Sequence, residues 1–171
     1  MFRFCPSCAS QKITFENHRF FRCPDCGFLY YHNTAAAAGC IIHTGKEIVL
    51  LIRAKEPAAG KLDFPGGFLE PGESALEGLS RECREELGWE PTGGFAFLAS
   101  FPNTYIYKGI SYSTCDLFFT LTAPGLTEKD FRLDPQEIAG LRFIRPLDID
   151  FEELAFESTR RAVRAYLDTL A

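Results

Sequence analysis

One segment, residues 67–89, constrains this 171-residue chain more than any other. It joins a glycine-rich loop to a predicted helix, because Ser74 and Glu77 have the spacing of a capping box and Gly88 favours a left-handed stop. We therefore expect a helix over about residues 75–87. At 3.6 residues per turn its apolar side chains form one stripe and its carboxylates gather on a neighbouring face. The predicted stripe consists of Leu76, Leu79, Cys83 and Leu87.

The acidic face of this helix brings together Glu82, Glu85 and Glu86. Carboxylates this close repel one another unless a cation lies among them. Oxygen ligands suit Mg²⁺ or Mn²⁺, so the face predicts a divalent-metal site. Arg81 is expected to pair with Glu73 across the loop and to hold the carboxylates in register. The alternative interpretation is a solvated acidic surface.

Segment 67–89 resembles the Nudix box, Gly-x5-Glu-x7-Arg-Glu-U-x-Glu-Glu-x-Gly-U, in which U is bulky and apolar. Cys83 and Trp89 occupy U positions where aliphatic residues are usual. Every fixed position is filled, by Gly67, Glu73, Arg81, Glu82, Glu85, Glu86 and Gly88. The resemblance implies an α+β fold, the Nudix α/β/α sandwich, with a mixed sheet between helices. It also implies hydrolysis, by water, of a nucleoside diphosphate linked to another group.

The resemblance further implies the roles of the box residues. By position, Glu82, Glu85, Glu86 and the carbonyl of Gly67 would bind one to three Mg²⁺ ions. Glu73 and Arg81 would brace that site. The ions would neutralise phosphate charge and lower the pKa of the attacking water.

A general base is also needed, and in the family it varies and often comes from a loop beyond the box. Glu137, just before a predicted strand, is the first candidate, and Glu128 is the second. For each of them the alternative is a solvated loop glutamate.

Four of the seven cysteines form two Cys-x2-Cys pairs. The pairs, Cys5-Pro-Ser-Cys8 and Cys23-Pro-Asp-Cys26, are separated by 14 residues, close to zinc-ribbon spacing. Four thiolates close a tetrahedral Zn²⁺ site, which is structural because no position stays open for water. Short predicted strands at 13–15 and 19–22 would not hold such a module without metal. Two disulfides or redox dithiols are the alternatives.

The chain is accordingly predicted to consist of a zinc ribbon at 1–32 and a Nudix domain at 33–171. In the second domain, strands are expected at 35–42, 47–53, 95–99, 110–121 and 139–144. A helix from about Ser158, as N-cap, to about Leu170 closes the chain, with Ala162, Val163, Tyr166 and Leu167 on its apolar side. Cys40, Cys83 and Cys115 are interpreted as small buried hydrophobic residues.

The order of ribbon and box resembles the NADH pyrophosphatase branch of the family. That branch carries a Ser-Gln-Pro-Trp-Pro-Phe-Pro motif after the box, whereas this chain has Ser100-Phe-Pro-Asn-Thr-Tyr-Ile-Tyr107. An NADH- or NAD-like dinucleotide or ADP-ribose is the favoured substrate. Nucleoside triphosphates, nucleotide sugars, a capped RNA end and a non-catalytic ADP-ribose or nucleotide sensor remain alternatives. Candidate substrate contacts are Arg53 and Lys61 for phosphate, and Tyr105, Tyr107 and Tyr112 for stacking on a base.

Charge and hydropathy limit the classes of partner that the chain is expected to bind. The net charge of -5 gives no general attraction to nucleic acid or to an anionic membrane, so nucleic acid is not favoured as a partner. No secretion signal or membrane span is apparent, and we expect a soluble cytoplasmic protein. Resemblance to NADH pyrophosphatases also suggests a homodimer.

Overall fold

The computed structural model describes residues 2–92 and 94–170, and the chain divides into two compact units, Met1–Thr34 and Ala35–Ala171. The first unit is a three-stranded antiparallel sheet. Its strands, in sheet order, are β1 (Thr14–Glu16), β2 (Phe20–Arg22) and β3 (Leu29–Tyr31). The third strand was not predicted, because a three-residue strand carries almost no periodic signal and is defined only by its pairing with β2.

Aromatic side chains form the small core of this unit. Phe21 is buried, and its ring centroid lies 4.5 Å from that of Phe15 and 4.7 Å from that of Phe2. So few buried residues stabilise a sheet weakly, and the four cysteines are the obvious additional restraint.

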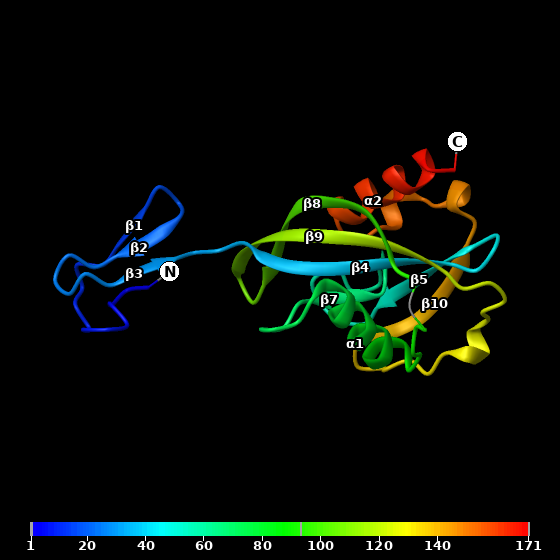
Figure 1. Cartoon of the computed structure of the whole chain (residues 1–171), viewed down its shortest axis with the longest axis horizontal. Coiled ribbons are helices and arrows are strands. Elements are labelled where there is room, and N and C mark those ends of the chain that lie inside the picture. Colours follow the sequence, from blue (N-terminus) through cyan, green and yellow to red (C-terminus); the bar gives the residue numbers. More distant parts are fainter. Residues whose placement is uncertain (1, 93, 171) are drawn as a thin grey trace. The chain divides into compact units, whose positions relative to one another are not determined.

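The second unit is built on a seven-stranded mixed sheet (Figure 1). The strand order is β10-β5-β4-β9-β8, with β6 paired to β5 and β7 paired to β4. The β4–β9 pair is parallel and the other pairs are antiparallel. The strands are β4 (Ala35–His43), β5 (Ile48–Arg53), β6 (Leu62–Asp63), β7 (Gly66–Phe68), β8 (Ala96–Tyr107), β9 (Ile110–Thr122) and β10 (Ile138–Ile144).

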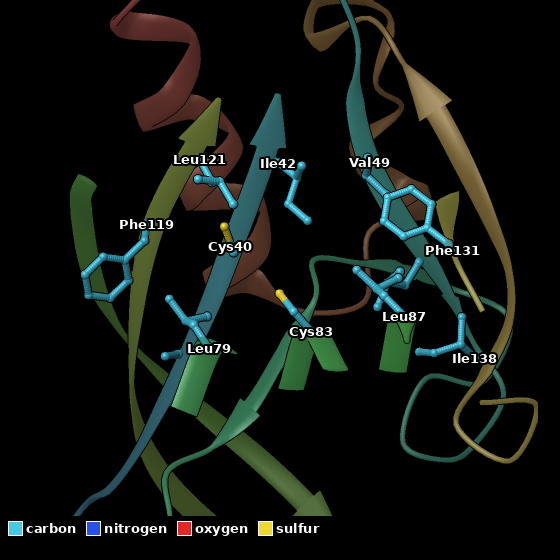
Figure 2. Packing of buried hydrophobic residues seen from close by; sticks show 12 residues of the cluster. Cys40, Ile42, Val49, Leu79, Cys83, Leu87, Phe119, Leu121, Phe131 and Ile138 are labelled. Atoms are coloured by element: carbon cyan, nitrogen blue, oxygen red, sulfur yellow. The ribbon is translucent and has the colours of Figure 1, made fainter. Parts of the chain in front are cut away.

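One α-helix packs on each face of this sheet: α1 (Ala75–Leu87) and α2 (Glu157–Asp168). Strand alternation divides the core between them, since Cys40 and Ile42 of β4 pack toward α1 whereas Ile41 packs toward α2. Figure 2 shows the α1 side, where Leu79 and Cys83 lie near Cys40 of β4 and Leu87 lies near Phe131 and Ile138. Short 3₁₀ segments lie in the connections, at η1 (Glu128–Asp130), η2 (Pro146–Asp148) and η3 (Phe151–Glu153). The predicted α+β sandwich is confirmed.

Two predictions about strands were wrong. Strand β8 extends to Tyr107 rather than ending at Ala99. It tolerates Pro102 because it is an edge strand, and the N–H that proline lacks would point to the open side of the sheet, where no strand could accept it. Cys115 is exposed rather than buried. Cys115 is on the face of β9 whose residues Leu117, Phe119 and Leu121 pack in the core on the α1 side, but that core does not reach residue 115.

Two predictions about helices were also wrong. Leu76 is 45% exposed, because the buried row of α1 follows the i+4 spacing from Ala75 through Leu79 and Cys83. Helix α2 begins at Glu157 with Phe156 as its N-cap, so Ser158 lies inside the first turn and is buried. Among the described residues no helix has both the length and the apolarity needed to cross a membrane.

Candidate metal and nucleotide site

Helix α1 is fixed at both ends, which sets the register of its glutamates. Ser74 Oγ accepts from the Glu77 N–H at 3.3 Å, and Glu77 Oε2 accepts from the Ser74 N–H at 2.8 Å. At the other end Gly88 has φ 57° and its N–H donates to the Arg84 carbonyl at 3.0 Å. The capping box, the left-handed stop and the bounds 75–87 are all confirmed.

Arg81 connects the loop to the acidic face of α1. Its Nε and Nη2 donate to the two carboxylate oxygens of Glu73, at 2.9 and 3.1 Å. Its Nη1 donates to Glu82 at 2.8 Å and to Glu85 at 2.9 Å. The remaining Nη2 hydrogen goes to the Phe68 carbonyl at 3.0 Å. The predicted Arg81–Glu73 pair is confirmed, and with five hydrogen bonds the guanidinium has no N–H left for a substrate.

The Arg81 contacts also set the charge state of Glu73. Hydrogen bonds from the guanidinium hold the pKa of Glu73 below its usual value, and the same pairing raises the pKa of Arg81. Both side chains therefore stay charged, as a brace requires.

Glu86 and Glu82 are held against the glycine loop. Glu86 is only 8% exposed, and its Oε2 accepts from the Gly66 N–H at 2.9 Å. Burial raises the pKa of Glu86 well above its usual value and also raises that of Glu82. A Cβ on residue 67 would overlap Glu82 Oε1, so a side chain there would displace the Glu82 carboxylate from its present position.

The donor set fits a hard cation. Three carboxylates, those of Glu73, Glu82 and Glu85, contact one guanidinium, and a fourth, that of Glu86, accepts from the N–H of Gly66 in the adjacent loop. Within the described part of the chain, Glu86 makes no ion pair. A buried carboxylate without a cation is costly, and Mg²⁺ or Mn²⁺ bound by oxygen atoms would supply the missing charge.

A cavity of about 480 Å³ opens beside these glutamates. Its walls come from segments far apart in the sequence: the glycine loop, strands β4, β6, β8 and β9, and the first turn of α2. Besides Glu82, Glu86, Gly66, Gly67 and Arg81, it is lined by Arg53, Asp63, Phe68, Asn103, Tyr105, Thr114, Asp116, Glu137, Phe156, Ser158 and Thr159, among others.

The structure brings only some of the other predicted residues to this cavity. Glu137 lines it and pairs with Lys55 at 3.0 Å, whereas Glu128 lies in η1 and is not part of the lining. Lys61 is outside and donates to the Glu152 carbonyl at 2.9 Å.

The predicted substrate contacts Arg53 and Tyr105 do line the cavity, and Tyr112 does not. Arg53 is partly committed within the protein, since its Nε donates to the Pro57 carbonyl at 2.9 Å and its guanidinium lies 5.1 Å over the ring of Phe156. The Tyr105 ring lies 5.7 Å from the Phe156 ring. These aromatic rings suit a planar ligand.

Sequence reasoning missed several polar residues of the cavity. Asp63 stands between the apolar Leu62 and Phe64 just before the glycine loop, and an acidic residue in that place was a usable signal. Ser158 was interpreted as a helix cap. Thr114 and Asp116, joined by a 2.6 Å hydrogen bond, gave no signal, because polar residues are common on strands with one open face.

The four cysteines of the first unit converge as a metal site requires. The Sγ atoms of Cys5 and Cys26 are 3.6 Å apart, those of Cys8 and Cys23 are 3.7 Å apart, and all four lie within 4.8 Å of one another. A tetrahedral Zn²⁺ with bonds of about 2.3 Å has sulfur–sulfur edges of about 3.8 Å. Disulfides would need about 2.05 Å, and all four thiols are free, so the separations match zinc and not disulfides.

Comparisons with known proteins agree with this geometry. The chain is 35% identical over 101 residues to "NAD-capped RNA hydrolase NudC" of Chromobacterium violaceum, a match over 58% of this chain and 38% of that protein. A second NudC, from Stutzerimonas stutzeri, is 36% identical over 86 residues, which are 50% of this chain and 31% of that protein. The matched regions thus span about a third of the length of these relatives.

Solved structures share the fold. A NUDIX hydrolase from Nitrosomonas europaea superposes with a TM-score of 0.71 at 22% identity, over 98% of this chain and 91% of that one. The NUDIX domain of Shewanella oneidensis NrtR, solved in complex with ADP ribose, gives 0.66 at 15% identity, over 82% and 91% of the two chains. The sequence model of the NUDIX domain matches residues 33–166, most of the chain, and the chain therefore belongs to the NUDIX domain family.

Proposed function

We propose that the chain is a Mg²⁺- or Mn²⁺-dependent hydrolase that cleaves the pyrophosphate of a nucleoside diphosphate linked to another group. An NADH- or NAD-like dinucleotide or ADP-ribose is the favoured substrate. The observation that carries the proposal is the buried carboxylate of Glu86, which pairs with no Lys, Arg or His among the described residues and lies on the wall of a cavity of about 480 Å³. That volume lies in the range of small-molecule sites.

In this proposal Glu82, Glu85, Glu86 and the Gly67 carbonyl hold the metal. When bound, the metal would offset phosphate charge and acidify a water molecule. Arg81 keeps Glu82 and Glu85 in position through its hydrogen bonds, and it does not contact substrate. Glu137, on the same cavity, accepts the proton of the attacking water.

A substrate panel tests the reaction. Metal-dependent release of AMP or phosphate would be measured for NADH, NAD, ADP-ribose, FAD, nucleotide sugars and nucleoside triphosphates. We expect turnover of the dinucleotides or ADP-ribose that disappears with EDTA. Tight binding of ADP-ribose without any turnover would instead favour a sensor.

A pair of variants tests the base. Glu137→Gln should lower kcat by about 10²–10⁴-fold, and Glu128→Gln should leave it near the wild-type value. Near-normal kcat in Glu137→Gln would reject the assignment, and a selective loss in Glu128→Gln would reverse it.

An NAD-capped RNA end is a second candidate, and the names of the NudC relatives favour it. The net charge argues against RNA over the whole chain, but the first unit carries Arg19 over the ring of Tyr31 at 5.8 Å and Arg22 over the ring of Phe20 at 5.3 Å. Such pairs of arginine and aromatic side chains suit single-stranded nucleic acid. A kcat/KM for a NAD-capped oligonucleotide well above that for free NAD would support this candidate, and the reverse order would exclude it.

For the first unit we propose a structural Zn²⁺ bound by Cys5, Cys8, Cys23 and Cys26. The convergence of their four Sγ atoms supports it. Elemental analysis should find about one zinc per chain. A protein that is folded and zinc-free after purification without chelators would contradict it.

A further inference from the structure

One wall of the cavity carries hydrogen-bonding groups that are not fully used by the residues the structure describes. It is formed by Asp63 at the end of β6 and by Ser158 and Thr159 in the first turn of α2, and we call it the β6–α2 wall. None of its residues belongs to the Nudix box, and none contacts the acidic face of α1 through a hydrogen bond.

Asp63 is held as a hydrogen-bond acceptor. Its Oδ1 accepts from the Phe64 N–H at 3.0 Å and from Thr159 Oγ1 at 2.9 Å. Its Oδ2 has only a long contact with Arg53 Nη1, at 3.4 Å. Every partner of this carboxylate is a donor, so Oδ2 keeps lone pairs for one further donor from a ligand.

Ser158 supplies the complementary group. Ser158 is 1% exposed, and its Oγ is a buried polar atom without a hydrogen-bond partner among the described residues. Buried hydroxyls are almost always paired, so an unpaired one on a cavity wall calls for an explanation. The first turn of α2 lines the cavity, so the positive end of the helix dipole also lies at this wall. The N-cap residue Phe156 makes no side-chain hydrogen bond to the start of α2, so no side-chain cap offsets that charge. Both features favour an acceptor atom of a ligand.

We propose that the β6–α2 wall determines specificity by binding the amino or carboxamide group of a planar heteroaromatic ring. The ligand N–H donates to Asp63 Oδ2, and the adjacent ring nitrogen or carbonyl oxygen accepts from Ser158 Oγ. Phe68, Tyr105 and Phe156 line the same cavity and provide apolar faces for the ring. The inference rests on the proposed function, because it takes the ring to be part of the nucleotide substrate.

Adenine and nicotinamide both carry this donor and acceptor side by side, and matched ligands distinguish them. AMP is compared with IMP, in which a carbonyl replaces the amino group, and nicotinamide mononucleotide is compared with nicotinic acid mononucleotide. These ligands have no pyrophosphate to cleave, so their affinities can be measured by calorimetry with Mg²⁺ present. We expect the amino or carboxamide member of at least one pair to bind about tenfold or more tightly than its analogue. The pair that shows the preference identifies the ring.

Two variants connect the preference to the wall. Asp63→Asn presents an amide N–H₂ and should shift the preference toward the carbonyl analogue. Ser158→Ala should weaken binding of the preferred ligand by about three- to tenfold without lowering Tm, because Ser158 Oγ has no hydrogen bond to lose within the part of the chain that the structure describes. The control, Asp148→Asn, removes a carboxylate outside the cavity that pairs with Arg145, and it should keep wild-type affinities.

Equal binding of both members in both pairs, or no binding of any of the four ligands, would overturn the inference. So would a wild-type preference in Ser158→Ala, which remains informative if Asp63→Asn does not fold. Failure of the proposed function has a different signature, since it would leave the binding preference in place while no metal-dependent hydrolysis is detected.

Discussion

Replacing Glu86 by Gln should stabilise the metal-free protein and remove its response to Mg²⁺. Burial raises the pKa of Glu86 in the folded state above its unfolded value. The folded state therefore binds this proton more tightly, and the contribution of Glu86 to stability falls as pH rises from the unfolded pKa toward the folded one. The pKa of Glu73 is lowered, so its contribution to stability has the opposite pH dependence. Both proteins contain Glu73, so that contribution cancels in the difference between wild type and Glu86→Gln.

The size of the effect follows from the contacts of Glu86. The Gly66 N–H donates to Glu86 Oε2 at 2.9 Å, and the amide oxygen of glutamine can accept the same hydrogen bond. The substitution therefore removes the charge without removing that hydrogen bond. Leaving a buried polar group without its partner costs about 1–3 kcal/mol and a charged group costs more, so about 1–3 kcal/mol is the least that the substitution should recover. At about 3 °C per kcal/mol, Tm should rise by about 3–9 °C in EDTA at about pH 8, and by less at about pH 5.

Thermal unfolding in EDTA and in Mg²⁺ checks this prediction. Magnesium should raise Tm of the wild type and have little effect on Glu86→Gln. The control is Glu90→Gln, at an exposed carboxylate paired with Arg84, which should change stability by less than about 0.5 kcal/mol. A Tm of Glu86→Gln at or below wild type in EDTA at about pH 8, or a gap that does not grow with pH, would refute the reasoning.

Three further predictions concern other parts of the molecule. Arg81→Lys loses the planar guanidinium that contacts Glu73, Glu82 and Glu85, so kcat/KM measured on the best substrate should fall by about 10–100-fold. The control Arg84→Lys should have little effect, and equal activities of the two variants would contradict the bracing role. Ser158→Ala removes a buried hydroxyl that has no hydrogen-bond partner among the described residues, so calorimetry should show an unchanged or higher Tm. A clear loss of stability would mean that the hydroxyl does have a partner. Zinc chelation should abolish hydrogen-exchange protection of the first unit, residues 1–34, while the strands of the second unit stay protected; retained protection would contradict a structural metal.

The segment around α1 could be predicted because its determinants are local. The capping box at Ser74, the left-handed stop at Gly88 and the Arg81–Glu73 pair all lie within a short stretch of chain, and the structure confirms each of them. Spacing also predicted the cysteine cluster, since two short loops suffice to bring four thiols together.

Predictions failed where burial depends on neighbours distant in sequence. Cys115 and Leu76 are apolar in a local pattern, yet the core on the α1 side does not reach Cys115, and the buried i+4 row of α1 leaves Leu76 exposed. The β6–α2 wall was not predicted, because Asp63 and Thr159 are 96 residues apart and meet only through packing.

The sequence by itself determined the family, the acidic helix α1 with its two ends, and the cysteine cluster, because periodicity, capping and residue spacing act over a few residues. Only the tertiary structure decided which other side chains reach the glutamates. It brought Arg53, Tyr105 and Glu137 to the cavity and left Lys61 and Tyr112 outside. The physical reason is that a cavity is the space left between packed elements, and sheet order and helix packing fix that space rather than any local pattern.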